Sequence, residues 1–161
     1  MFSRKRLELL PKATREKVIA ALFKAKFPGF AVKSGIDIDV PAGYSVRVAA
    51  LLTLEEQREI VKKVFVVMEE FNAFITKVDI DTIVEYTEQL KETGVFHPER
   101  DDFYLVTNQR WTYEAFTYAK GKIVLMDLDT VIEVINKYLE KESRRAETLK
   151  KDLERLGLRV D

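Results

Sequence analysis

The feature that most constrains the fold is a continuous apolar run at Val64–Met68, followed at once by Glu69 and Glu70. A short run of this kind, rich in β-branched residues, is typical of a strand that is buried on both faces of a sheet. Helices must then cover both faces. The run therefore predicts a central strand in a layered α/β domain, with acidic side chains where the strand ends.

The patterns around this run alternate between strand and helix. Helix starts are indicated by Pro11 and Thr14, by the capping-box pattern Thr53-Leu54-Glu55-Glu56, and by Thr112. We expect an α/β sheet that is at least partly parallel. The predicted order is a helix from 11 to 27, strands at 30–33, 36–40 and 44–52, a helix at 53–63, the central strand at 64–68, a helix ending at 93, a strand at 103–107, a helix at 112–120, a strand at 123–126 and a final long helix.

Composition narrows the class of protein. The chain has 161 residues, 47% of them hydrophobic, which is enough for a domain with a real core. It has no cysteine, which excludes disulfides and thiolate metal sites. No apolar run approaches the ~20 residues of a membrane span, and no signal-peptide core follows the basic N-terminus, so we predict a cytoplasmic protein. Charged residues reach 34% against six Asn and Gln, a composition that leans toward a thermophile.

The final helix carries a second pattern. Apolar residues recur at alternating steps of three and four, interrupted by Glu142, at Ile132, Ile135, Leu139, Ala146, Leu149, Leu153 and Leu156. This spacing is typical of a heptad seam, which either pairs with a second copy of the chain or folds back on its own domain. We divide the chain into an α/β domain over residues 1–130 and a long helix over 131–161, which is predicted to form a homodimer.

Charge is unevenly spread, although the net charge is zero. Residues 1–33 carry nine Lys or Arg against two Glu, a net of +7, and residues 34–110 carry eight against fifteen, a net of −7. The basic N-terminal segment, which ends at Lys33, is either a solvated helix face or a surface that contacts DNA phosphates. The acidic middle has the charge that a metal site needs.

Two acidic strand ends are the candidate metal ligands. Asp39 lies near the end of Gly35–Val40 and Glu70 follows the central run. Oxygen ligands on neighbouring strands hold Mg²⁺ rigidly, and the metal activates a water for phosphodiester cleavage. A lysine two residues after Glu70 would point into the same site, but Asn72 stands there, and Lys77 lies five residues further on. The other interpretation is that both acids are exposed strand ends without a metal.

Several local strings, in this order, resemble the PD-(D/E)XK nuclease superfamily, the restriction-endonuclease-like fold. The resemblance covers about residues 14 to 135 and is closest at the end to Mrr-type restriction endonucleases. The matching strings are Arg15-Glu16-Lys17-Val18-Ile19-Ala20-Ala21-Leu22, Phe27-Pro28-Gly29-Phe30-Ala31-Val32, Gly35-Ile36-Asp37-Ile38-Asp39-Val40, Phe65-Val66-Val67-Met68-Glu69-Glu70-Phe71-Asn72, Tyr104-Leu105-Val106-Thr107-Asn108, Thr112-Tyr113-Glu114-Ala115-Phe116-Thr117-Tyr118-Ala119 and Ile123-Val124-Leu125-Met126-Asp127.

The resemblance implies a mixed sheet flanked by helices. It makes Asp39 the metal-binding Asp, Glu70 the second carboxylate and Glu16 the acid that some members place on the first helix. The other interpretation of Glu16 is an exposed helix-start residue favoured by the helix dipole. The chain departs from the family at Asn72, which replaces the lysine, and at residues 41–63, which we interpret as an inserted strand and helix.

The loop after the strand at 103–107 supplies further candidates. Asn108 and Arg110, with Lys33 of the basic N-terminal segment, are predicted DNA contacts. Trp111 either stacks on a base or packs beside the Thr112 cap. The lone histidine, His97, has no partner motif. We expect a DNA-binding protein, acting as a Mg²⁺-dependent endonuclease if the site is intact, with Lys77 or Asn72 positioning the water. The alternative is an inactive, nuclease-like assembly module that self-associates through its final helix.

Overall fold

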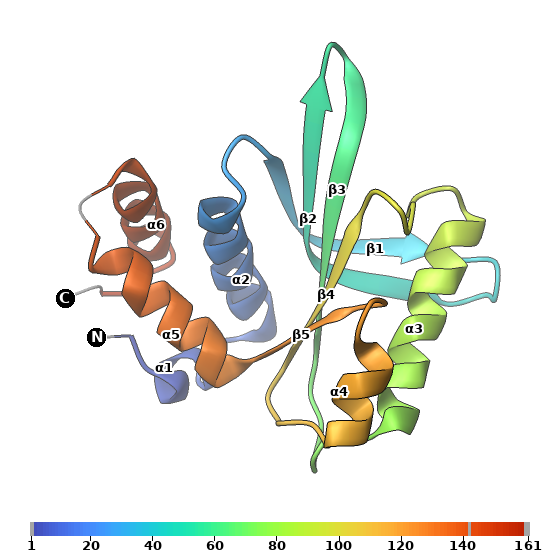
Figure 1. Cartoon of the computed structure of the whole chain (residues 1–161). Helices are drawn as coiled ribbons and strands as arrows, with labels where there is room; N and C mark the ends of the chain where they lie inside the picture. The colour runs from blue at the N-terminus through green and yellow to red at the C-terminus, as the bar shows by residue number, and fades with distance from the viewer. Residues whose placement is uncertain (1, 142, 160–161) are drawn as a thin grey trace.

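The computed structural model describes residues 2–141 and 143–159. One mixed sheet has the strand order β1-β2-β3-β4-β5, with β1, β2 and β3 antiparallel and β3, β4 and β5 parallel (Figure 1). Along the chain the elements are α1 (Arg4–Glu8), α2 (Lys12–Lys26), β1 (Ala31–Asp39), β2 (Ser45–Glu56), β3 (Glu59–Glu69), α3 (Lys77–Glu92), β4 (Asp102–Thr107), α4 (Tyr113–Ala119), β5 (Val124–Asp127), α5 (Leu128–Leu139) and α6 (Arg144–Arg155).

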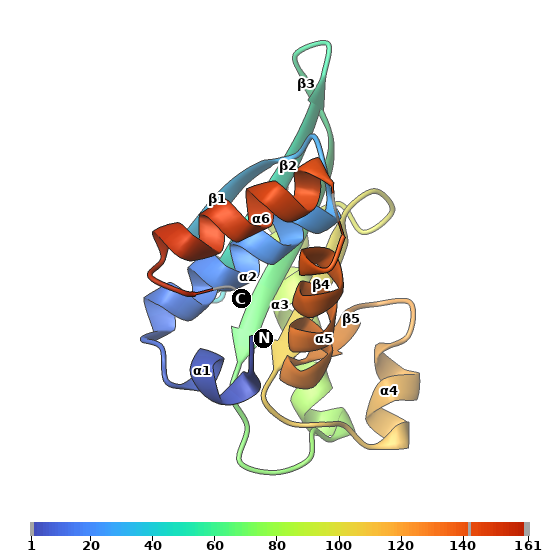
Figure 2. The same ribbon diagram turned by 90° about the vertical axis from the view of Figure 1, so that its left-hand side faces the viewer.

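Helices cover both faces of the sheet, as the apolar run predicts. Alternate residues of β3 point to opposite faces, so Val64 and Val66 join a core under α2, α5 and α6, while Phe65 and Val67 join a second core under α3 and α4. Figure 2 shows α6 lying along α2 on the first face. The three-layer α/β arrangement follows directly from the double burial of this strand.

The predicted helix at 53–63 is wrong, because β2 continues to Glu56 and turns directly into β3. The turn residues Gln57 and Arg58 both have positive φ angles, 52° and 68°, between the paired residues Glu56 and Glu59. Pairing along the two strands outweighs the helical preference of the local Glu-rich sequence. Residues 41–63 therefore do not form an inserted strand and helix. They are the middle of an antiparallel meander.

Two smaller differences concern strand and helix boundaries. The strands predicted at 30–33 and 36–40 form one strand, β1, with Gly35 inside it. The predicted long final helix is instead two helices, of which α5 ends at Leu139 and α6 begins at Arg144. Because α6 lies along α2, Leu149 and Leu153 are fully buried in the same core as α2. Glu142, which interrupts the predicted seam, lies outside the described residues.

The two ends of β2 have different neighbours, and this difference shapes the site. β2 pairs with β1 from Ser45 to Thr53, but its pairing with β3 runs only from Ala50 to Glu56. The segment from Ser45 to Ala49 diverges with β1 toward α3 (Figure 1), where Val46 and Val48 join the second core. The ends of β1 and β3 are thereby drawn apart.

Candidate functional site at the carboxyl edge of the sheet

The parallel strands β3, β4 and β5 end side by side. Glu69 of β3 pairs with Thr107 of β4, which pairs with Asp127 of β5. In α/β sheets, ligands bind outside the carboxyl ends of parallel strands, because the connecting loops gather there. The loops that follow β3 and β4 (residues 70–76 and 108–112) and the N-terminal helices α1 and α2 surround this edge.

The two loops are held together by backbone and side-chain hydrogen bonds. The Phe71 N–H donates to Oδ1 of Asn108 at 2.7 Å, and Nδ2 of Asn108 donates back to the Phe71 carbonyl at 3.0 Å. Ile75 N donates to the Arg110 carbonyl, and Thr112 N donates to the Ile75 carbonyl, which forms a bridge between Ile75 and Trp111. The Asn108 amide therefore fixes the loops, a role that its sequence position did not reveal.

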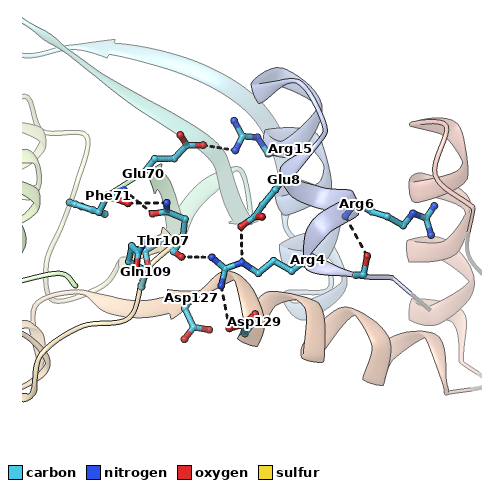
Figure 3. A network of polar contacts seen from close by, with 12 residues as sticks. Arg4, Arg6, Glu8, Arg15, Glu70, Phe71, Thr107, Gln109, Asp127 and Asp129 are labelled. Atoms are coloured by element: carbon cyan, nitrogen blue, oxygen red, sulfur yellow. Dashed lines mark hydrogen bonds and ion pairs between the residues drawn. The ribbon is translucent and has the colours of Figure 1, made fainter. Parts of the chain in front are cut away.

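Arginines from α1 and α2 close over the same edge (Figure 3). Arg4 donates to the Asn108 carbonyl and to the carboxylates of Glu8 and Asp129, at 2.7 and 3.2 Å for the two carboxylates. Arg15 pairs with Glu70, which is largely exposed. Arg4 and Arg15 were not predicted as site residues, because nothing in the local pattern indicates that α1 and α2 begin beside the ends of β3 and β4.

A cavity of about 220 Å³ lies between these helices and the strand ends. Among its lining residues, Glu69 is partly buried, and burial raises the pKa of its carboxyl group, while the nearby Lys12 charge opposes that rise. Nε of Arg15 is buried without a hydrogen-bond partner among the described residues. The lining residues are Leu7, Lys12, Arg15, Ile19, Met68, Glu69, Glu70, Val106, Thr107, Asn108 and Leu128.

The predicted metal ligands Asp39 and Glu70 are not brought together. Asp39 ends β1, where its carboxylate accepts a hydrogen bond of 2.5 Å from Ser45. Glu70 follows β3 and pairs with Arg15. β2 stands between β1 and β3, and its first half diverges from β3, so the two acids end on separated strands.

The residues predicted to assist them are also placed elsewhere. Asn72 is exposed in the loop after β3. Lys77 is the first residue of α3 rather than a loop residue, and its Nζ lies 5.1 Å from the centre of the Tyr118 ring. Within residues 2–141 and 143–159, no three His, Asp or Glu side chains converge as a metal would require. The predicted set therefore does not fit a Mg²⁺ site.

Glu16 is buried in a charge cluster of its own. Only 2% of the residue is exposed, and Arg47 of β2 donates two hydrogen bonds to its carboxylate and one to Asp37. The hydrogen bonding of Arg47 to the Glu16 carboxylate is the largest cause that raises the pKa of Arg47. Gly35, with φ of +65°, lets the guanidinium approach, since a Cβ there would lie 2.9 Å from Nη2 of Arg47. The prediction of an exposed helix-start residue is wrong.

The predicted DNA contacts differ in their exposure to solvent and in their pairing with carboxylates. Lys33 is exposed on β1, and the Arg110 side chain is 75% exposed, with Nε 3.7 Å from Asp127. In the basic N-terminal segment, Arg4, Arg15 and Lys24 are engaged by carboxylates. The backbone of His97 takes part in the turn at Asp101, to whose carboxylate its N–H donates. No helix in the described part of the chain has the length and apolar character to cross a membrane.

Comparison with solved structures identifies the fold. The chain is similar to AF1548, a protein of unknown function, with a TM-score of 0.54 and 16% identity over 92% of this chain and 72% of that one. It is also similar to the MspJI restriction endonuclease bound to a 27-mer oligonucleotide, with a TM-score of 0.54 and 11% identity over 95% of this chain and 34% of MspJI.

A third similar structure is the DNA modification-dependent restriction endonuclease AspBHI, with a TM-score of 0.50 and 10% identity over 98% of this chain and 43% of AspBHI. The sequence matches no protein-family model and no curated protein. The chain spans well under half of each of the two restriction enzymes. The mixed five-stranded sheet with its flanking helices is a restriction-endonuclease-like fold.

Proposed function

We propose that this chain binds DNA with the loops at the carboxyl edge of β3, β4 and β5. The observation that carries the proposal is the exposure of aromatic and cationic side chains on two rigidly joined loops and at the start of α4, which follows the second loop. Phe74 is 63% exposed, Tyr113 at the start of α4 is 84% exposed, and the Arg110 side chain, three residues before Tyr113, is 75% exposed. Large aromatic residues this exposed mark an interaction surface.

The backbone geometry explains why these side chains face outward. Ile75 and Trp111 form the bridge between the loops, and Ile75 is fully buried. In extended segments adjacent residues point to opposite sides, so Phe74 and Arg110 both face away from the core. Aromatic faces stack on bases, and an arginine pairs with a phosphate oxygen, which together suit nucleic acid in which bases are accessible.

The fold supports the same partner, since MspJI was solved with an oligonucleotide and AspBHI is a restriction endonuclease. Mg²⁺-dependent cleavage at Asp39 and Glu70 has no such support, because those carboxylates lie on separated strands and Asn72 supplies no charge. A plasmid-nicking assay with Mg²⁺ or Mn²⁺ tests it. Cleavage by the wild type that Asp39→Ala abolishes would restore the catalytic hypothesis, and no cleavage would leave DNA binding alone.

Fluorescence anisotropy with labelled single-stranded and duplex oligonucleotides tests binding. Removing a stacked aromatic costs about 1–3 kcal/mol per base, so Tyr113→Ala should weaken binding roughly fivefold or more. Arg110→Met should weaken binding and lower the slope of log K against log salt by about 1. Arg145→Ala, an exposed change on α6, is the matched control. No salt-dependent binding by the wild type, or equal binding by all three variants, would contradict the proposal.

The alternative of an inactive assembly module pairing through the final helix stays a prediction. It has less support, because Ile135, Ala146, Leu149 and Leu153 of the proposed seam are buried within this chain. Light scattering measures the mass of the particle directly. A dimer that persists when the exposed charged residues of α6 are changed to residues of opposite charge would place any interface elsewhere.

A further inference from the structure

The cavity beneath α1 and α2 contains polar groups that the fold does not use. Nε of Arg15 is buried without a partner, and no hydrogen bond or ion pair is formed by the side chains of Lys12 and Glu69 among the described residues. By contrast, the amide of Asn108 and the hydroxyl of Thr107 bond to the backbone of the neighbouring loops. Lys12 and Glu69 are thus free to bind a ligand, and Arg15, whose Nη1 pairs with Glu70, has a further unused donor at Nε.

The rest of the lining is apolar and comes from the core. Leu7, Ile19 and Val106 are fully buried, and Leu128 and Met68 complete the apolar wall. The cavity volume of about 220 Å³ is below the roughly 300–1,000 Å³ of sites for drug-sized ligands, so it suits a small, flat group. Glu69 is half-buried in the cavity, and burial disfavours the charged form of its carboxyl group. A carboxyl group that is kept there at this cost in stability is expected to serve a ligand.

A phosphate does not match this chemistry. The two carboxylates of the lining, Glu69 and Glu70, balance its two cations, so the cavity has no net positive charge to hold a dianion, and its apolar wall offers no hydrogen bonds. A nucleobase does match, because its faces are apolar and its edge carries both donors and acceptors. An amino group on the base would donate to Glu69, and a carbonyl oxygen would accept from Arg15 or Lys12.

We propose that this cavity receives a single unpaired base of the bound DNA, with preference for bases that carry both an amino group and a carbonyl, as guanine and cytosine do. The inference rests on the proposed function, since the exposed loops that contact the DNA continue directly from β3 and β4, whose last residues line the cavity. A base that is already unpaired enters without the cost of breaking a pair.

The methyl group of Met68 reports on the cavity directly. The chain has three methionines, of which Met68 lines the cavity and Met126 lies on β5 outside its lining. In protein labelled with ¹³C at the methionine methyls, each signal is assigned by a Met→Leu variant. Guanosine, and a duplex with one unpaired guanine, should shift the Met68 signal through the ring current of the base and leave the Met126 signal in place.

Variants identify the polar contacts. Glu69→Gln should weaken the binding of guanosine, measured from the shift of the Met68 signal, at least tenfold, because a hydrogen bond to a charged group contributes that much or more. Lys12→Met, at an exposed position, should weaken the binding of guanosine less than Glu69→Gln does. Glu133→Gln, an exposed change on α5, is the matched control and should leave it unchanged. Thermal melting of each variant confirms that it is folded, so that a lost signal reports binding.

The outcomes separate this inference from the proposed function. A Met68 signal that neither guanosine nor the bulged duplex shifts, while anisotropy still detects DNA binding, would overturn the base site alone. A shift by guanosine without any DNA binding would keep the base site and overturn the DNA proposal. A shift by inorganic phosphate equal to that by guanosine would make the cavity an anion site and refute the inference.

Discussion

Arg47 on β2 holds the buried carboxylate of Glu16 on α2 with two hydrogen bonds, of 3.0 Å from Nε and 2.9 Å from Nη2. A third hydrogen bond of 3.0 Å joins the same guanidinium to Asp37 on β1. One cation therefore ties a helix to two strands where β1 and β2 begin to diverge from β3. Glu16 is engaged in holding the fold together rather than free to bind a metal.

The first prediction concerns this contact. Arg47→Met leaves the Glu16 carboxylate buried without a partner, so we expect a clear fall in the urea concentration at the midpoint of unfolding. Glu16→Gln combined with Arg47→Met should recover much of the loss, because no buried charge remains. Lys137→Met, which breaks an exposed pair with Glu133, should change the midpoint little. A midpoint of Arg47→Met as high as that of the wild type would contradict the structural role.

The second prediction concerns pH. Burial raises the pKa of Glu69 in the folded chain above its unfolded value of about 4.3. The folded state then binds more protons than the unfolded state, so Glu69 lowers stability as pH rises through this range. We expect Glu69→Gln to be more stable than the wild type at pH 7, with the difference shrinking toward pH 3. Urea unfolding across this range measures it, and a constant difference would show that Glu69 ionisation is not the cause.

The third prediction concerns the turn between β2 and β3. Gln57 and Arg58 occupy a two-residue turn with positive φ angles that Asn-Gly adopts more readily. Left-handed backbone costs about 1–2 kcal/mol for an ordinary residue relative to glycine, so Gln57→Asn with Arg58→Gly should raise the free energy of unfolding by about 1 kcal/mol. Arg58→Ala is the control, since it removes the same side chain but keeps a Cβ, and it should give no such gain.

The fourth prediction concerns α6. Leu153 is fully buried against the core that α2 and α5 share, so Leu153→Ala should lower the free energy of unfolding by about 2–4 kcal/mol. The matched control is Lys151→Ala, an exposed change on the same helix, which should cost little. A small effect of Leu153→Ala, together with a fall in particle mass by light scattering, would instead favour a seam between two copies of the chain.

The elements with strong local patterns were predicted well from the sequence. The apolar run at Val64–Met68 identified the central strand and the helical layers on both of its faces. Helices at Lys12–Lys26 and Tyr113–Ala119 lie where the spacing and the Thr112 cap placed them. These features depend on residues a few positions apart, which is the range over which periodicity and capping act.

The helix predicted at 53–63 failed for the opposite reason. Thr53, Leu54 and Glu55 read as a helix start, but each lies opposite a residue of β3, Lys63, Lys62 and Ile60 respectively. The backbone bonds of that pairing are not visible in the local pattern. The metal-site prediction also depended on a long-range relationship, since the two acidic strands were expected to hold one ion together while β2 lies between them in the sheet.

The sequence by itself determined the α/β class, the buried central strand and the order of most helices and strands. Only the tertiary structure decided that Asp39 and Glu70 stand apart, that Arg47 engages Glu16, and that Lys12, Arg15 and Glu69 meet at one cavity. The physical reason is that each of these relationships joins residues distant in the chain. The divergence of β1 and β2 from β3, and the docking of α1 and α2 over the strand ends, set their positions.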